Sequence, residues 1–145
     1  MRPLLALAAI ALIATPAFAV KPPREQSPPP EGLLKALGIG VSDEELDKAI
    51  AAAAGQPLGS TGNPIRVGGP IGERAYIARL RCADGKAPRI GQRGSAGVGA
   101  FGSIVDIYPL DCGAAAPGKV ALVMDMYHSE HEEDRAPAGF AIQPR

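Results

Sequence analysis

Two apolar segments, Phe101 to Tyr108 and Lys119 to Tyr127, dominate the second half of this 145-residue chain. Each is a short apolar run bounded by glycine or proline, which is typical of a strand in a small sheet. The segment 113–118 between them reads GAAAPG and predicts a hairpin turn. Gly139 to Ile142 predicts a short additional edge strand.

The pattern before these segments predicts two more strands. Ile65 to Val67 is expected to begin the sheet, the glycines and proline at 68–70 to turn the chain, and Ala75 to Cys82 to return. Residues of the returning segment alternate between two faces, as in a half-buried strand. One face carries Tyr76, Ala78, Leu80 and Cys82. The following stretch, 86–102, is a glycine-rich excursion.

The hairpin also has a predicted register. If opposed residue numbers add to an odd total, one face of the strand pair is uniformly apolar, and the other face carries both Asp106 and Asp125. An even total places Asp106 among the methionines and is disfavoured, because a one-residue slip moves every side chain to the other face.

Helical patterns are confined to residues 32–56. Gly32 to Ile39 predicts a short helix, and Asp43 to Ala54 predicts a second one. Ser42 and Glu45 form the sequence signature of a capping box, and Gly55 is placed to end the helix. The predicted apolar stripe of this helix comprises Leu46, Ile50, Ala53 and Ala54.

Together these patterns predict an α+β fold. Two short N-terminal helices precede a small antiparallel sheet of four or five strands, which one disulfide pins together. The expected organisation is a signal peptide at 1–19, a proline-rich tether at 20–31, a helical segment at 32–56 and a β domain at 57–145.

The first nineteen residues predict export. Arg2 precedes the unbroken apolar run from Leu4 to Ala14, and residues 17–19 are a small-x-small cleavage site. The alternative, a membrane anchor, is disfavoured because eleven helical residues span only ~16 Å of a ~30 Å hydrocarbon core. We therefore expect a bacterial periplasmic or secreted protein without a membrane span after cleavage.

The charge balance argues against nucleic acid as a partner. Lys plus Arg number 15, and Asp plus Glu also number 15. A protein that binds nucleic acid through phosphate contacts carries an excess of positive charge. Residues 74–93 are locally basic, which mutual neutralisation across the fold explains. The alternative is a surface for an anionic partner such as a cell-envelope polymer, formed by Arg79, Arg81, Arg89 and Arg93.

The only two cysteines, Cys82 and Cys112, predict a structural disulfide, since a lone pair in an exported protein is most often oxidised. Closing a loop of about 30 residues is worth about 3–4 kcal/mol. A redox or metal pair is disfavoured because the C-x-x-C spacing is absent. No Ser/His/acid or Cys/His set argues for an enzyme.

Three further motifs carry weaker hypotheses. His128 and His131 lie in an acidic segment and, with Glu130 and Asp125, are candidate ligands for Zn²⁺, Cu²⁺ or Ni²⁺; the alternative is a solvated acidic turn. Asp106 and Asp125 are a possible carboxylate pair. The glycine pattern at 97–102 matches a dinucleotide motif but lacks the helix that must follow it.

No known family is recognised in these residues. The sequence therefore favours a non-catalytic, exported cell-envelope module that binds a partner protein or polymer. The alternative is a transition-metal-binding protein using the His128 and His131 segment. Otherwise no cofactor is expected.

Overall fold

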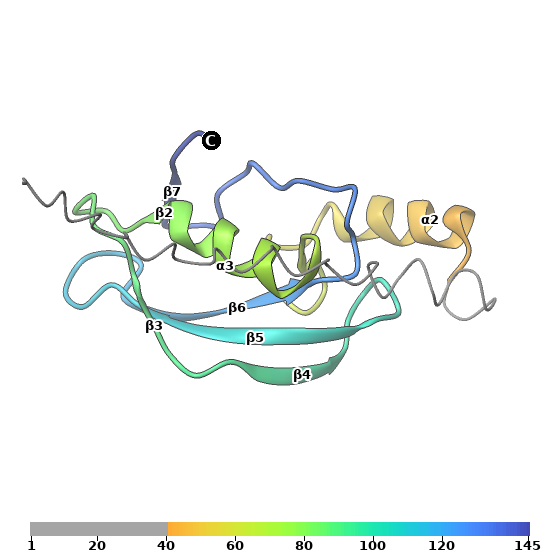
Figure 1. Ribbon diagram of the computed structural model, residues 1–145, viewed down its shortest axis with the longest axis horizontal. Coiled ribbons are helices and arrows are strands. Elements are labelled where there is room, and N and C mark those ends of the chain that lie inside the picture. Colours follow the sequence, from red (N-terminus) through yellow and green to blue (C-terminus); the bar gives the residue numbers. More distant parts are fainter. Residues whose placement is uncertain (1–40) are drawn as a thin grey trace, which may run out of the picture.

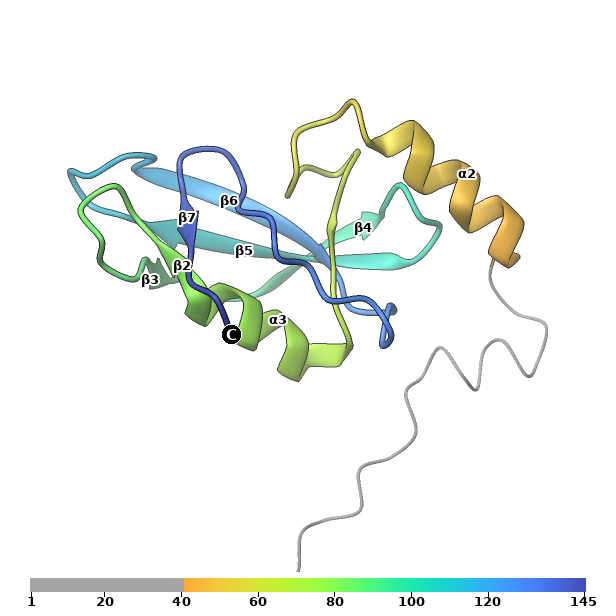
Figure 2. The ribbon, with the colours of Figure 1, turned by 90° about the horizontal axis from the view of Figure 1, so that it is seen from above.

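The computed structural model describes residues 41–145. The predicted signal peptide, the tether and the helix at 32–39 lie outside the described residues and stay predictions. The described part is α+β, with a mixed sheet of five strands, a small two-stranded ladder and one disulfide. Figures 1 and 2 show α3 lying over one face of the sheet. No helix in the described part is long and apolar enough to cross a membrane.

The first described element is helix α2, Asp43–Ala53, and its predicted start is confirmed. The backbone N–H of Glu45 donates to Ser42 Oγ at 3.3 Å, and the N–H of Ser42 donates to Glu45 Oε2 at 2.9 Å. This reciprocal pair satisfies two of the backbone donors that every helix start leaves open. Ala53 is the one buried residue of α2. The helix is therefore attached to the rest mainly through its C-terminal end.

The five-stranded sheet has the order β1-β6-β5-β3, and β4 also pairs with β5. The pairing of β1 with β6 is parallel and the other pairings are antiparallel, so the prediction of a wholly antiparallel sheet was wrong in this respect. The strands are β1 Ile65–Arg66, β3 Arg89–Ile90, β4 Gly94–Val98, β5 Ile104–Asp111 and β6 Lys119–Asp125.

The predicted strand from Ala75 to Cys82 is wrong. Residues Gly69–Arg79 form helix α3, and only Leu80–Arg81 is extended, as β2. Pro70 lies in the first turn of α3, where its missing N–H costs no hydrogen bond. The buried positions of this segment follow helical spacing rather than alternation. They are Glu73, Tyr76, Ile77 and Leu80.

Strand β2 does not join the main sheet. It pairs antiparallel with β7, Ala141–Ile142, which lies within the predicted edge strand at 139–142. The Nε of Arg79 donates to the carbonyl oxygen of Gln143 at 2.8 Å, which fixes the C-terminal segment beside the end of α3. The two-stranded ladder thus ties the last residues of the chain to the helical layer.

The hairpin register is the opposite of the predicted one. Asp106 pairs with Met124 and Tyr108 with Leu122, so opposed residue numbers add to an even total. Asp106 therefore lies on the face covered by α3, and Asp125 lies on the other face. Both faces are apolar near this end, since Val105 and Val123 are buried as well as Met124. The expectation of one uniformly apolar and one polar face does not describe this sheet.

The main core lies between α3 and the sheet. It is formed by Ile65, Val67, Tyr76, Ile77, Leu80, Tyr108, Leu110, Leu122 and Met124. At its edge, the predicted disulfide between Cys82 and Cys112 is confirmed. It connects the residue that follows β2 with the residue that follows β5, and thereby joins the helical layer to the sheet.

Candidate functional site

A pocket of about 320 Å³ lies between the C-terminal end of α2, strand β1 and the segment that follows β6. Its apolar lining comes from Ile50 of α2, from Ala54, the residue that follows α2, and from Phe101. The polar lining is formed by Asn63, Arg66, His131, Glu133 and Arg135. The last three residues belong to the blue segment that leaves β6 in Figure 1.

Arg66 is placed in this pocket by the parallel pairing of β1. Ile65 pairs with Met124 in the core, and Arg66 pairs with Asp125, so successive side chains point to opposite faces. The guanidinium carbon lies 5.8 Å from the centre of the Phe101 ring, in a cation–π contact. Partial burial lowers the pKa of Arg66, and the attraction of Glu133 opposes this shift.

The Arg66 guanidinium has no hydrogen-bond or ion-pair partner in the described part of the chain. Within residues 41–145 it makes no hydrogen bond and no ion pair within 4.0 Å, although it is partly buried. A guanidinium carries five N–H donors arranged for a planar acceptor. The nitrogens of Arg66 are not among the buried atoms that lack a partner, so they stay open to water, and Glu133 attracts the charge without an ion pair within 4.0 Å. The pocket therefore presents a cation whose donors a ligand can reach.

Glu133 and Arg135 form the opposite wall of the pocket. Arg135 donates to both carboxylate oxygens of Glu133, from Nε at 2.9 Å and from Nη2 at 2.8 Å. The backbone N–H of Arg135 adds a third bond at 3.0 Å. Burial alone would raise the pKa of Glu133, but these bonds outweigh it and lower the pKa to about 2. Arg135 is thus neutralised by Glu133, whereas Arg66 is not.

His131 lines the pocket, and His128 lies beside Phe101. His128 Nε2 is 3.4 Å from Asp125 Oδ2, and its ring meets Phe101 edge-on at 5.5 Å between centroids. Asp125 also accepts a short hydrogen bond from Ser103 Oγ. His131 Nε2 lies 3.6 Å from Glu133 Oε2, and burial lowers the pKa of His131. This network holds the Phe101 wall and the segment that carries Glu133.

The four predicted metal ligands do not come together as one set. His128 is beside Asp125, His131 is beside Glu133, and Glu130 is exposed. In the described part of the chain, no group of three His, Cys, Asp or Glu residues is arranged to hold a metal ion. Metal binding by this segment stays a prediction.

The predicted carboxylate pair is not formed, because the observed register puts Asp106 and Asp125 on opposite faces of the sheet. Asp106 instead lies beside Glu73 of α3, with Arg93 contacting both carboxylates. Glu73 was not among the candidate residues. Tyr108 OH donates to Glu73 Oε2 at 2.8 Å. Arg93 Nη1 lies 3.4 Å from Glu73 Oε2 and 3.3 Å from Asp106 Oδ2.

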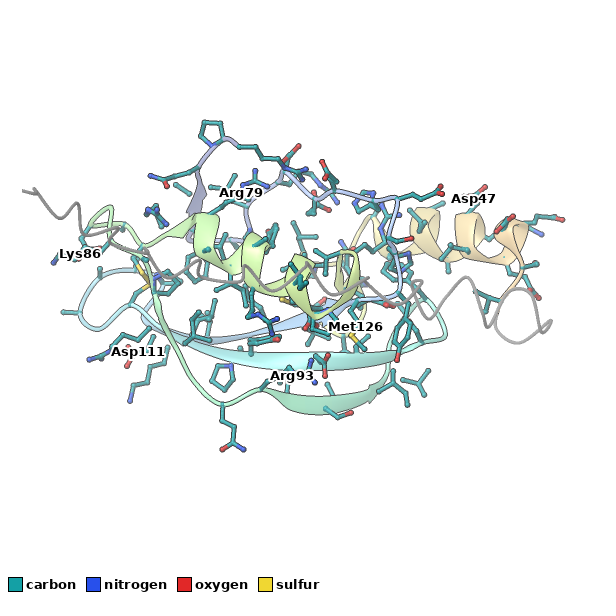
Figure 3. All side chains as sticks on the ribbon, viewed as in Figure 1. Asp47, Arg79, Lys86, Arg93, Asp111 and Met126 are labelled. Carbon is teal, nitrogen blue, oxygen red and sulfur yellow. A yellow bond between two sulfur atoms is a disulfide. The ribbon has the colours of Figure 1, made fainter. Side chains whose placement is uncertain are left out.

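The four arginines of the predicted basic surface all have acceptors. Arg79 pairs with Asp134, Arg89 pairs with Asp111, and Arg93 meets the two carboxylates just described. Arg81 donates to the side chain of Gln143. In Figure 3, Arg79 lies above α3 and Arg93 lies below it beside the strands, so these two arginines are on different sides of the helix. Their arrangement agrees with mutual neutralisation.

Comparison with other proteins adds no function. No protein-family model matches the chain, and no curated protein or solved structure shows significant similarity to it. The pocket and its unpaired arginine are therefore the features on which a functional hypothesis can be built.

Proposed function

We propose that this protein is an exported, non-catalytic binding module that takes up a small organic anion in the pocket of Arg66. Export follows from the signal-like leader, and an oxidised cysteine pair suits a periplasmic or extracellular setting. The observation that carries the proposal is the partly buried Arg66 guanidinium, which has no acceptor within residues 41–145.

The charge of the pocket favours a ligand with a single carboxylate. Glu133 and Arg135 cancel, so Arg66 leaves one positive charge for the ligand to neutralise. A carboxylate matches the guanidinium fork with two parallel hydrogen bonds. A multiply charged anion would bring more negative charge than Arg66 alone can neutralise.

The apolar lining favours an aliphatic or aromatic group attached to that carboxylate. Ile50 of α2 and Ala54 directly after it line the pocket, and the Phe101 ring lies under Arg66. An apolar group of the ligand would remove this surface from water at roughly 25 cal/mol per Å². Hexanoate combines both features and is a suitable probe, although the natural ligand is defined here only by its chemistry.

Hexanoate is expected to bind the wild-type protein, and Arg66→Ala is expected to weaken binding at least tenfold. The reason is that a charge-assisted hydrogen bond contributes about 1.5–3 kcal/mol. Isothermal titration calorimetry at pH 7 and low salt measures both affinities. Arg74→Ala is the matched control, since Arg74 is an exposed arginine that does not line the pocket.

Hexanol and sulfate separate the two contributions in the same experiment. Hexanol keeps the apolar chain without the charge, and sulfate keeps the charge without the chain, so both are expected to bind more weakly than hexanoate. Equal affinity of the Arg66→Ala and Arg74→Ala variants for hexanoate would contradict the proposal. Binding of sulfate as tight as that of hexanoate would indicate a general anion site instead.

A second candidate is binding of Zn²⁺, Cu²⁺ or Ni²⁺ by the histidine segment. It is favoured by one observation: the buried Nε2 atoms of His128 and His131 have no hydrogen-bond partner in the described part. Titration of each metal into wild type and a His128→Ala/His131→Ala double variant tests this. Micromolar binding that the double variant loses would support it, and equal binding by both proteins would remove it.

A further inference from the structure

Glu73 is the one acidic residue of α3, and its side chain is fully enclosed. Its exposed fraction is 0%, and its Oε1 atom has no hydrogen-bond partner among the described residues. A fully ionised carboxylate at this position would be expensive, because burial penalises the charged form. The unpartnered oxygen therefore requires an explanation.

The groups that face Glu73 come from two places. Strand β5 contributes Asp106 and Tyr108, and the segment between β3 and β4 contributes Arg93. Strand β6 meets α3 with apolar residues of the core. The segment after β6 reaches other residues of α3, since Tyr76 donates to the carbonyl oxygen of Arg135.

The charges of this cluster balance only with one added proton. Glu73 and Asp106 bring two negative charges when both are ionised, and Arg93 brings one positive charge. Arg93 Nη1 contacts one oxygen of each carboxylate, which places Asp106 beside Glu73. A proton on Glu73 makes the cluster neutral, and the protonated carboxyl gains a hydrogen-bond donor.

We propose that Glu73, enclosed beside Asp106 and Arg93, carries a proton in the folded protein, so that the packing of α3 on the sheet responds to pH. The direction of the response follows from linkage. Burial and the nearby Asp106 raise the pKa of Glu73 to about 7, whereas Tyr108 and Arg93 oppose the shift. The folded protein thus binds more protons than the unfolded chain between about pH 4.5 and 7, and folding weakens as pH rises through this window.

The direct test is a ¹³C NMR titration of the Glu73 side-chain carboxyl in the wild-type protein. We expect a titration midpoint near neutrality, well above the ordinary range of a glutamate carboxyl. Arg93→Ala removes the cation of the cluster and is expected to move the midpoint higher; Arg93 is 44% exposed, so this variant is expected to fold. A wild-type midpoint near 4.5, or a midpoint that falls in Arg93→Ala, would overturn the proposal.

Stability measurements give a second readout. Between pH 5 and 8, the unfolding equilibrium constant of the wild type is expected to increase by a factor at least ten times larger than that of Glu73→Gln. The reason is that the amide imitates the protonated carboxyl at every pH. Glu130→Gln is the control and should follow the wild type. Identical pH dependence of wild type and Glu73→Gln would also overturn the proposal. Should Glu73→Gln not fold, the wild-type titration decides.

Discussion

Reduction of the Cys82–Cys112 disulfide is expected to lower the free energy of unfolding by about 3–4 kcal/mol, the loop-closure value for a sequence separation of 30 residues. The bridge joins the end of the helical layer to the end of β5, across a loop that contains β3, β4 and β5. Opening it frees the unfolded chain to explore more conformations. The core is small, so this loss is a large fraction of a typical domain stability.

Chemical denaturation with and without reductant measures this effect. The double variant Cys82→Ala/Cys112→Ala should unfold at the same denaturant concentration as the reduced protein and be insensitive to reductant. If the wild type unfolds at one midpoint under both conditions, the disulfide does not support this fold.

Glu133→Gln is expected to lower the free energy of unfolding by about 3 kcal/mol at pH 7. The Glu133 side chain is 4% exposed and accepts three hydrogen bonds from Arg135. The neutral amide loses the charge that makes these bonds strong and has one oxygen in place of two. Thermal or chemical unfolding measures the loss, and Glu130→Gln in the same segment is the control.

The pH dependence of this effect has a definite sign. The pKa of Glu133 is lowered from 4.5 to about 2 in the folded protein. Its contribution is therefore complete above about pH 4.5 and is lost as pH falls toward 2. Wild type and Glu133→Gln should converge in stability at the acid end. A constant difference between them down to pH 2 would contradict the assigned ion pair.

The errors of sequence interpretation in the helical layer have a physical origin. In the segment 75–82, the same apolar residues satisfy alternation and helical spacing almost equally well. The charged Glu73 occupies an inward position of α3, which hides the helical stripe. Pro70 was assigned to a turn, although the first turn of a helix suits it equally. By contrast, the capping box at Ser42 is a purely local signal, and the start of α2 was predicted correctly.

The register error has a related cause. An even total was rejected because it buries Asp106, but tertiary contacts compensate for that burial. Arg93, from a distant glycine-rich segment, and Glu73, from the misassigned helix, both reach Asp106. A pattern of apolar and polar residues contains no information about such partners. The disulfide was predictable because it depends on composition and compartment rather than on packing.

The candidate pocket could be predicted only in part. His131 was a candidate because it lies in an acidic segment, whereas Arg66 and Phe101 belong to no recognisable motif. Their meeting depends on the parallel pairing of β1 with β6 and on the turn before β5. The one usable signal was the position of Arg66 inside a predicted strand, where a charged side chain must find a partner or a ligand.

The ¹⁵N chemical shift of Arg66 Nε during titration with hexanoate tests the anion pocket most directly. We predict that the Arg66 Nε–H signal shifts and saturates at the affinity measured by calorimetry, while the signal of Arg74 stays in place. An Arg66 signal that does not move, or one that moves together with Arg74 without saturation, would contradict a specific anion site at Arg66.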